Sequence, residues 1–157
     1  MKRVLLKSVF DAFEYVMDHY YPFGLKELVE KADTYAVISL QDSYTGGGFG
    51  FTFNRTGFCR DVLTLYVDDV VQPTDGAVLF SEEHAAQIIA FIQKNRGVDT
   101  LLVHCYAGQS RSRAVAAFAV KMLGADNRAY FEGGNPNMYI YRTLTETYQK
   151  RFAGQKP

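Results

Sequence analysis

The amino-acid sequence predicts an α/β fold, a single domain in which helices flank a central, mostly parallel sheet. β-rich runs and helix-like segments alternate along the 157 residues, which is the pattern of parallel strands joined by covering helices. The length and the 48% hydrophobic content are enough for one packed core but not comfortably for two. We therefore expect residues 1–157 to form one domain.

The N-terminal segment predicts a strand followed directly by a helix. Residues 4–7 are β-rich, and Ser8 precedes Asp11 by the three residues that are typical of a helix start. The apolar residues that follow predict a helix over residues 9–20.

Two further strands are predicted on either side of a loop. Residues 36–40 (AVISL) and 62–67 (VLTLYV) are short β-rich runs of the kind found in buried strands. Between them, residues 41–58 are rich in glycine and aromatic side chains, which predicts a long surface loop or an irregular hairpin. The glycines do not follow a strand in the G-x-G-x-x-G spacing, so we expect no dinucleotide cofactor.

The second half of the chain predicts a turn, one strand and three helices. Residues 73–76 (PTDG) form the turn, and Ser81 begins a helix whose isoleucines recur at helical spacing. Residues 100–103 (TLLV) are typical of a strand at the centre of a sheet. Apolar helices are predicted over residues 113–123 and about 140–152.

Composition argues against several classes of partner and setting. Lysine plus arginine equals aspartate plus glutamate at 17 each, so no strong field attracts nucleic acid or an anionic membrane. No apolar run approaches the roughly 20 residues that span a bilayer. The chain has only two cysteines, and Lys7 interrupts its start before a signal-length apolar core. We therefore expect a cytoplasmic protein without nucleic-acid or membrane partners.

Residues 104–112 (HCYAGQSRS) lie between a predicted strand and a predicted helix. At such a position, open α/β sheets bind anions. Small residues let the backbone amides approach phosphate oxygens, and the amides of the helix start add partial positive charge. We expect the phosphate to be held by Tyr106, Ala107, Gly108, Gln109, Ser110 and Arg111.

Three side chains of this stretch suit phosphoryl transfer through a cysteine. The amides around Cys105 would stabilise a thiolate, which is a nucleophile at neutral pH. Arg111, six residues later, can hold two phosphate oxygens with its planar guanidinium, and Ser112 can donate a hydrogen bond to the departing sulfur. An isolated cysteine at a strand end is more often a small buried hydrophobe. Here, five positions coincide in the required context: His104, Cys105, Gly108, Arg111 and Ser112.

With these residues, the sequence resembles the cysteine-dependent protein tyrosine and dual-specificity phosphatases, whose motif is His-Cys-x-x-Gly-x-x-Arg-Ser/Thr. The resemblance extends loosely over about residues 36–144, and is strongest to compact bacterial or phage members, which carry an Asn-Pro-Asn segment like residues 135–137. It implies a phosphoester hydrolase that forms a phosphocysteine, needs no cofactor or metal, and acts on a phosphorylated protein or a small phosphoester. Phosphate or sulfate is expected to be able to occupy the loop. The alternative is a pseudophosphatase module that binds phosphate without turnover.

The resemblance also implies a general acid, an aspartate on the loop after the preceding strand. The sequence offers Asp68, Asp69 and Asp75. We favour Asp69, which ends the strand as the family's acid does. Asp75 has the better separation from Cys105 but lies in a turn, and Asp68 ranks third.

The remaining histidines and the second cysteine are expected to be structural. His104 would orient the loop, while His19 and His84 lack partners at metal-ligand spacing. Cys59 could form a disulfide with Cys105 or serve as the resolving thiol of a reductase, but we favour a free buried thiol.

The variable loop positions bear on the substrate. Tyr106, Gln109 and Ser110 are not basic, whereas phosphatases for polyanionic lipids or inositol phosphates tend to carry lysines there. The sequence therefore favours a singly phosphorylated substrate. The aromatic residues of 44–58 either form a wall for a phosphotyrosine ring or pack as a satellite core.

Overall fold

The computed structural model describes residues 1–22, 24, 33–45 and 53–152. Its framework is a four-stranded sheet in the order β1-β4-β2-β3. The pairings are all parallel, so the carboxyl ends of the strands lie at one edge. The strands are β1 (Arg3–Lys7), β2 (Tyr35–Gln41), β3 (Cys59–Tyr66) and β4 (Thr100–His104). The predicted α/β class and its parallel sheet are confirmed.

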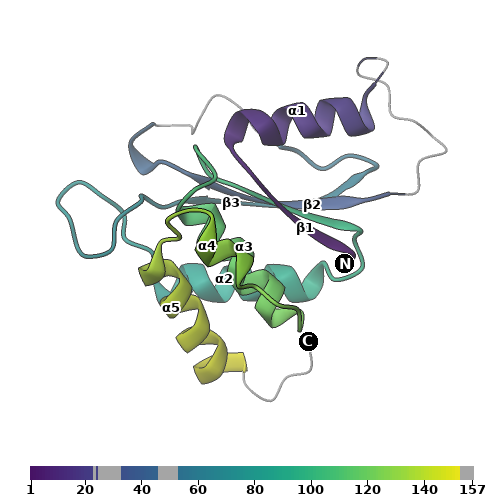
Figure 1. Ribbon diagram of the computed structural model, residues 1–157. Helices are drawn as coiled ribbons and strands as arrows, with labels where there is room; N and C mark the ends of the chain where they lie inside the picture. Colours follow the sequence, from purple (N-terminus) through teal and green to yellow (C-terminus); the bar gives the residue numbers. More distant parts are fainter. Residues whose placement is uncertain (23, 25–32, 46–52, 153–157) are drawn as a thin grey trace.

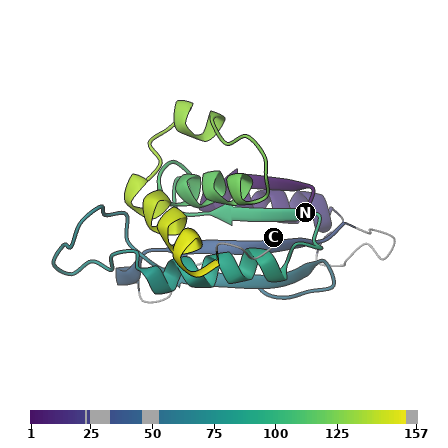
Figure 2. The ribbon, with the colours of Figure 1, turned by 90° about the horizontal axis from the view of Figure 1, so that it is seen from below.

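Helices cover both faces of this sheet (Figures 1 and 2). One face is covered by α1 (Val9–Tyr20), and the other by α2 (Glu82–Lys94) and α3 (Arg111–Met122), on which α5 (Met138–Thr147) packs. β2 and β4 are buried along their whole length because they occupy the two central positions. No helix within the described ranges is long and apolar enough to cross a membrane.

Two of the predicted helix starts, those after Ser8 and at Ser81, are confirmed by side-chain caps. Ser8 Oγ accepts a hydrogen bond from Asp11 N at 3.1 Å. Ser81 Oγ accepts one from His84 N at 3.2 Å, and His84 Nδ1 in return accepts one from Ser81 N at 3.0 Å. Each such cap stabilises its helix by about 1 kcal/mol.

The ends of several other helices and strands differ from the prediction, because polar residues there interrupt the apolar pattern. β3 begins at Cys59 rather than residue 62, because Thr56 Oγ1 accepts from Cys59 N and turns the chain into register with Tyr35. α3 begins at Arg111, two residues early, and α5 ends at Thr147. A π-helical turn, η2 (Tyr148–Phe152), follows. The short elements η1 (Ser43–Thr45) and α4 (Ala129–Glu132) were not predicted.

The predicted loop over 41–58 is described only in part. Gln41 belongs to β2, η1 follows, and residues 53–58 contain no helix or strand. Residues 46–52 lie outside the described residues.

Candidate active site

The residues of the predicted motif meet at the carboxyl edge of the sheet, between the end of β4 and the start of α3 (Figure 1). Loop 105–110 connects the two elements and packs against the junction of β1 and α1. Gly108 has a φ of 74°, and a Cβ there would lie 2.9 Å from the backbone carbon of Lys7 and 3.0 Å from Ser8 N. Glycine is therefore required at this position, both for its backbone conformation and for the close approach.

The sulfur of Cys105 lies inside this loop with two hydrogen-bonding neighbours. Gly108 N donates to Cys105 Sγ at 3.3 Å, and Ser112 Oγ lies 3.0 Å from the same sulfur. Cys105 is 2% exposed, and Ser112 is fully buried. Donors at these positions stabilise negative charge on sulfur, so the structure brings the predicted nucleophile and the predicted hydroxyl donor together.

The start of α3 differs from the other long helices because it has no side-chain cap. Ser110 precedes α3 without a capping hydrogen bond, whereas Ser8, Ser81 and Asn137 cap α1, α2 and α5. The Ser110 hydroxyl instead donates a hydrogen bond to Asp69 Oδ1 at 2.7 Å. Among the described residues, no side chain caps the first amides of α3, the kind of donors that bind anions at helix starts.

Arg111 is held at the first position of α3 by two partners, which directly follow β3 and β2. Its Nη1 donates to Val67 O at 2.8 Å and lies 2.7 Å from Asp42 Oδ1. Both side chains are largely buried, so each charge compensates the other. Both contacts use Nη1, and among the described residues no further group is hydrogen bonded to this guanidinium.

Asp42 was missed by the sequence analysis. It directly follows β2, whose carboxyl end lies beside that of β4. A carboxylate immediately after a buried parallel strand is the signal that points to this edge.

Of the three candidate acids, the structure brings Asp69 to loop 105–110. Its Oδ1 accepts from Ser110 Oγ at 2.7 Å and from Asn137 Nδ2 at 2.9 Å. Asp75 is exposed in the turn that Ala77 N closes on Thr74 O.

Asp68 is buried and hydrogen bonded to neighbouring loop residues. It is 7% exposed and accepts hydrogen bonds from Val78 N at 2.7 Å and from the backbone and hydroxyl of Ser43. Burial by itself raises the pKa of Asp68, but the hydrogen bonds outweigh it and lower the pKa overall. Asp68 thus ties the segment after β3 to residue 43.

The histidines have protein partners. His104 Nδ1 lies 3.2 Å from Cys105 O, and burial lowers the pKa of His104, so a neutral ring donates this bond. His19 pairs with Asp33 at 2.9 Å, and His84 belongs to the cap of α2. In the part of the chain that is described, no group of histidine, cysteine, aspartate or glutamate side chains could hold a metal ion.

The two cysteines are free thiols at opposite ends of the sheet. Tyr35 is paired with both Cys59 and Thr100, and β4 then runs on to His104. At a rise of roughly 3.3 Å per residue, the four steps from Thr100 to His104 separate Cys105 from the level of Cys59 by at least about 13 Å. A disulfide needs Cα atoms within about 7 Å, so the disulfide that the sequence allowed cannot form in this fold.

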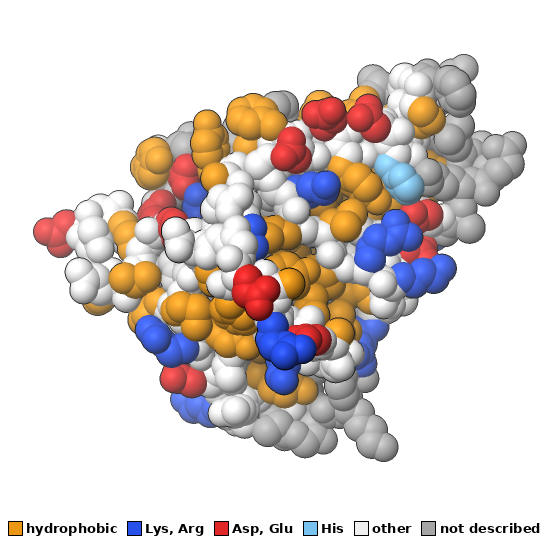
Figure 3. Space-filling model, in the orientation of Figure 1, with side chains coloured by type: hydrophobic (Ala, Val, Ile, Leu, Met, Phe, Trp, Pro, Cys, Tyr) orange, Lys and Arg blue, Asp and Glu red, His pale blue; other side chains and the backbone are white. Residues whose placement is uncertain are grey.

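An aromatic rim borders the loop on the side of α1. Tyr106 is 53% exposed, and its ring meets the ring of Phe10 edge to face with centroids 6.1 Å apart. Val9 N donates to Tyr106 O at 3.0 Å, which fastens the first turn of α1 to the loop. Figure 3 shows hydrophobic and acidic side chains over this helix.

The predicted wall from residues 44–58 is only partly described. Phe53 and Phe58 are buried in the cluster between α1 and the sheet, as a satellite core requires. Tyr44 is 78% exposed.

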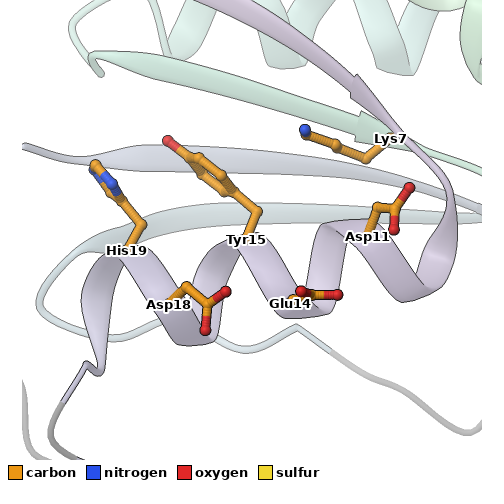
Figure 4. A pocket seen from close by; sticks show the side chains of 6 residues that line it. All are labelled: Lys7, Asp11, Glu14, Tyr15, Asp18 and His19. Atoms are coloured by element: carbon orange, nitrogen blue, oxygen red, sulfur yellow. The ribbon is translucent and has the colours of Figure 1, made fainter.

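A separate hollow of about 380 Å³ lies along α1 (Figure 4). Figure 4 shows the Lys7 side chain reaching across from the end of β1, and its Nζ lies 5.8 Å from the Tyr15 ring centre. The remaining lining side chains are Asp11, Glu14, Asp18 and His19. None of the lining residues is a cysteine or belongs to loop 105–110, so the hollow is distinct from the site around Cys105.

Comparison with protein-family models and with curated protein sequences finds no match. Solved structures do match. The human tyrosine phosphatase-like serine/threonine/tyrosine-interacting protein is 19% identical with a TM-score of 0.54, covering 91% of this chain and 89% of its own. PTPMT1 in complex with PI(5)P is 16% identical with a TM-score of 0.54, covering 94% and 91%. OH1 of the Orf virus, a tyrosine phosphatase, is 14% identical with a TM-score of 0.51, covering 96% and 83%. The chain therefore has the fold of these tyrosine phosphatases and tyrosine phosphatase-like proteins.

Proposed function

We propose that this protein is a phosphoester hydrolase, a protein tyrosine or dual-specificity phosphatase that works through a phosphocysteine intermediate. The proposal depends on one observation, the polar groups that surround the sulfur of Cys105. Cys105 Sγ has the amide of Gly108 at 3.3 Å and the hydroxyl of Ser112 at 3.0 Å, beside an uncapped helix start and a fixed arginine. The fold that the chain shares with OH1 of the Orf virus, a tyrosine phosphatase, supports the same chemistry.

In the first step, the Cys105 thiolate attacks phosphorus. The S–P bond forms as the P–O bond to the leaving group breaks, and Asp69 gives its proton to the departing oxygen. The loop amides and Arg111 hold the three other phosphoryl oxygens, whose charge is redistributed in the transition state.

In the second step, water attacks the phosphocysteine and gives its proton to the Asp69 carboxylate. The S–P bond breaks, inorganic phosphate leaves, and the sulfur regains its charge. The hydroxyl of Ser112, 3.0 Å away, donates a hydrogen bond to the departing sulfur. The same loop would hold inorganic phosphate or sulfate in the resting enzyme.

The substrate that fits this loop carries a single phosphate. Tyr106, Gln109 and Ser110 are themselves uncharged, and Gln109 Oε1 accepts a hydrogen bond from Arg113 Nη2 at 3.3 Å. The exposed ring of Tyr106 suits an aromatic or apolar group next to the phosphate. The free thiols also fit a reducing, cytoplasmic setting.

The test is turnover of an aryl phosphate and a panel of phosphopeptides by the wild type and Cys105→Ser. We expect the wild type to release phosphate and to yield a phosphocysteine after rapid acid quench. Cys105→Ser should bind phosphate without turnover, because a serine hydroxyl does not ionise at neutral pH. Phosphopeptide binding by a wild type that releases no phosphate would instead establish the binding-only module.

The role of Asp69 has its own test. Asp69→Asn should slow esters with basic leaving groups by about 10²–10⁴-fold, and esters with acidic leaving groups much less, because only the former need a proton. The basic limb of the pH profile should flatten. Asp75→Asn is the matched control, and a leaving-group effect in that variant alone would move the acid to Asp75.

A further inference from the structure

Asn137 joins three parts of the candidate site. It precedes α5 and is 4% exposed. Its backbone N donates to Ser110 O at 3.1 Å, in the loop before α3. Its side-chain Nδ2 donates to Asp69 Oδ1 at 2.9 Å and to Val70 O at 3.2 Å, on the segment that follows β3. One residue thus connects the phosphate-binding loop, the aspartate segment and α5.

The orientation of the Asn137 amide is fixed by its role as a helix cap. Its Oδ1 accepts from Ile140 N at 3.0 Å, which closes the first turn of α5. The Nδ2 group must then face Asp69, and both of its hydrogens are used. A flipped amide would place an oxygen against the Asp69 carboxylate and leave the Ile140 amide without its acceptor.

The two donors to Asp69 converge on the same oxygen. Both Asn137 Nδ2 and Ser110 Oγ bind Oδ1, whereas Oδ2 has no hydrogen-bond partner among the described residues. An oxygen that accepts two hydrogen bonds is a poor site for a proton, because a proton there would point at its own donors. The proton of the acid form is thus directed to Oδ2.

We propose that Asn137 is the positioning residue of the general acid: it fixes the Asp69 carboxyl and keeps its transferable proton on Oδ2. This inference rests on the proposed function. In the first step, the Oδ2–H bond breaks as that proton moves to the leaving oxygen, while Oδ1 keeps its two donors. In the second step, the water proton returns to Oδ2.

Two substitutions separate this role from simple capping. Aspartate and serine cap helices about as well as asparagine, so Asn137→Asp and Asn137→Ser both keep an acceptor for Ile140 N. Neither keeps the Nδ2 donor to Asp69. Asn135→Ser, at an exposed position two residues earlier, is the matched control.

We expect kcat/KM for esters with basic leaving groups to fall about 10-fold in Asn137→Ser and more in Asn137→Asp, since misplacing a catalytic group by about 1 Å can cost 100-fold. Esters with acidic leaving groups should change less than about threefold. In Asn137→Asp the second carboxylate disfavours ionisation of its neighbour, so the basic limb of the pH profile should move to higher pH. Thermal unfolding should stay close to wild type in Asn137→Ser, whereas Asn137→Asp buries a second carboxylate beside Asp69 and should be less stable.

A readout without turnover separates this inference from the proposed function. The Asn137 side-chain amide protons, followed by NMR, should exchange slowly with solvent, and their signals should move in Asp69→Asn but not in Asp75→Asn. Unmoved signals, or capping variants that match the wild type on every leaving group, would overturn the positioning role. Absence of phosphate release by the wild type, with the amide signals behaving as expected, would overturn the proposed function alone.

Discussion

The two ends of the sheet each carry a buried cysteine and a carboxylate that is at least half-buried, yet their surroundings differ. At the amino end, Cys59 lies in an apolar cluster, and burial raises its pKa to about 11. At the carboxyl end, Cys105 lies in a loop between a strand and a helix start, with an amide and a hydroxyl beside its sulfur. The two buried sulfurs therefore differ in their polar neighbours, and the reactivity that we propose for Cys105 depends on this difference.

The carboxylates differ in the same way. Asp61 is saturated by Asn95 Nδ2 at 3.0 Å, Arg55 Nη2 at 2.9 Å and Lys94 Nζ at 3.3 Å. Burial opposes its charge, but these partners prevail and lower the pKa of Asp61 to about 2. The carboxylate of Asp42 instead holds Arg111 by one nitrogen. Asp61 thus lies among side chains of its own end of the sheet, while Asp42 joins the carboxyl end of β2 to the start of α3.

The largest expected difference between the two ends is in the cysteines. Cys105→Ala should lower turnover on the order of 10⁴-fold or more, and Cys59→Ala by less than about twofold. Iodoacetamide should alkylate Cys105 at least about 100-fold faster than Cys59, because a thiol with a pKa near 11 is almost wholly protonated at neutral pH. Mass spectrometry of the two peptides measures both rates. Inorganic phosphate should protect Cys105 alone, and equal protection of both would contradict the comparison.

The next effect concerns the arginines. Arg111→Lys should lose at least ~100-fold in kcat/KM, about 2.7 kcal/mol, because an ammonium cannot bind two phosphoryl oxygens in parallel. Arg55→Lys at the amino end, where the side chain is 68% exposed, should stay within about twofold. Steady-state kinetics of both variants measure this. If kcat/KM of Arg111→Lys were within a few-fold of wild type, Arg111 would supply charge only.

A smaller effect is expected for the partner of Arg111. Asp42→Asn should lower kcat about 10-fold, roughly 1.4 kcal/mol, because the guanidinium loses the anion that fixes it. KM should not rise, since the arginine keeps its charge. The opposite pattern, a raised KM with unchanged kcat, would assign Asp42 to substrate binding.

The smallest effect on turnover is expected at Asp61, where stability changes instead. The pKa of Asp61 is about 2 when folded, against about 3.9 for an unfolded chain, so the carboxylate stabilises the fold above pH 4 and loses this contribution as pH falls toward 2. Asp61→Asn should reduce the free energy of unfolding at pH 7 by about 1–2 kcal/mol. This is less than the energy to which the full pKa difference corresponds, because Arg55 and Lys94 are largely exposed and solvent screens their charges. Urea unfolding at pH 7 and near pH 2 measures this, and the difference from wild type should shrink at the lower pH.

Features encoded over a few residues could be predicted from the sequence alone. The strand at 36–40 and the helix starts at Ser8 and Ser81 follow from β-rich runs and from hydrogen bonds that span three residues. The motif around Cys105 is equally local, because strand, loop and helix start are consecutive in the chain. Local spacing therefore determined the fold class and the candidate nucleophile.

Only the tertiary structure decided which distant groups join that motif. Asp42 reaches Arg111 because β2 and β4 are neighbours in the sheet. Asn137 reaches Asp69 across 68 residues because α5 begins where loop 105–110 and the segment after β3 meet. No periodicity records such contacts, since they depend on strand order and on how helices close over the sheet. For the same reason, the sequence left Asp69 and Asp75 open, and the fold places only the former against the loop.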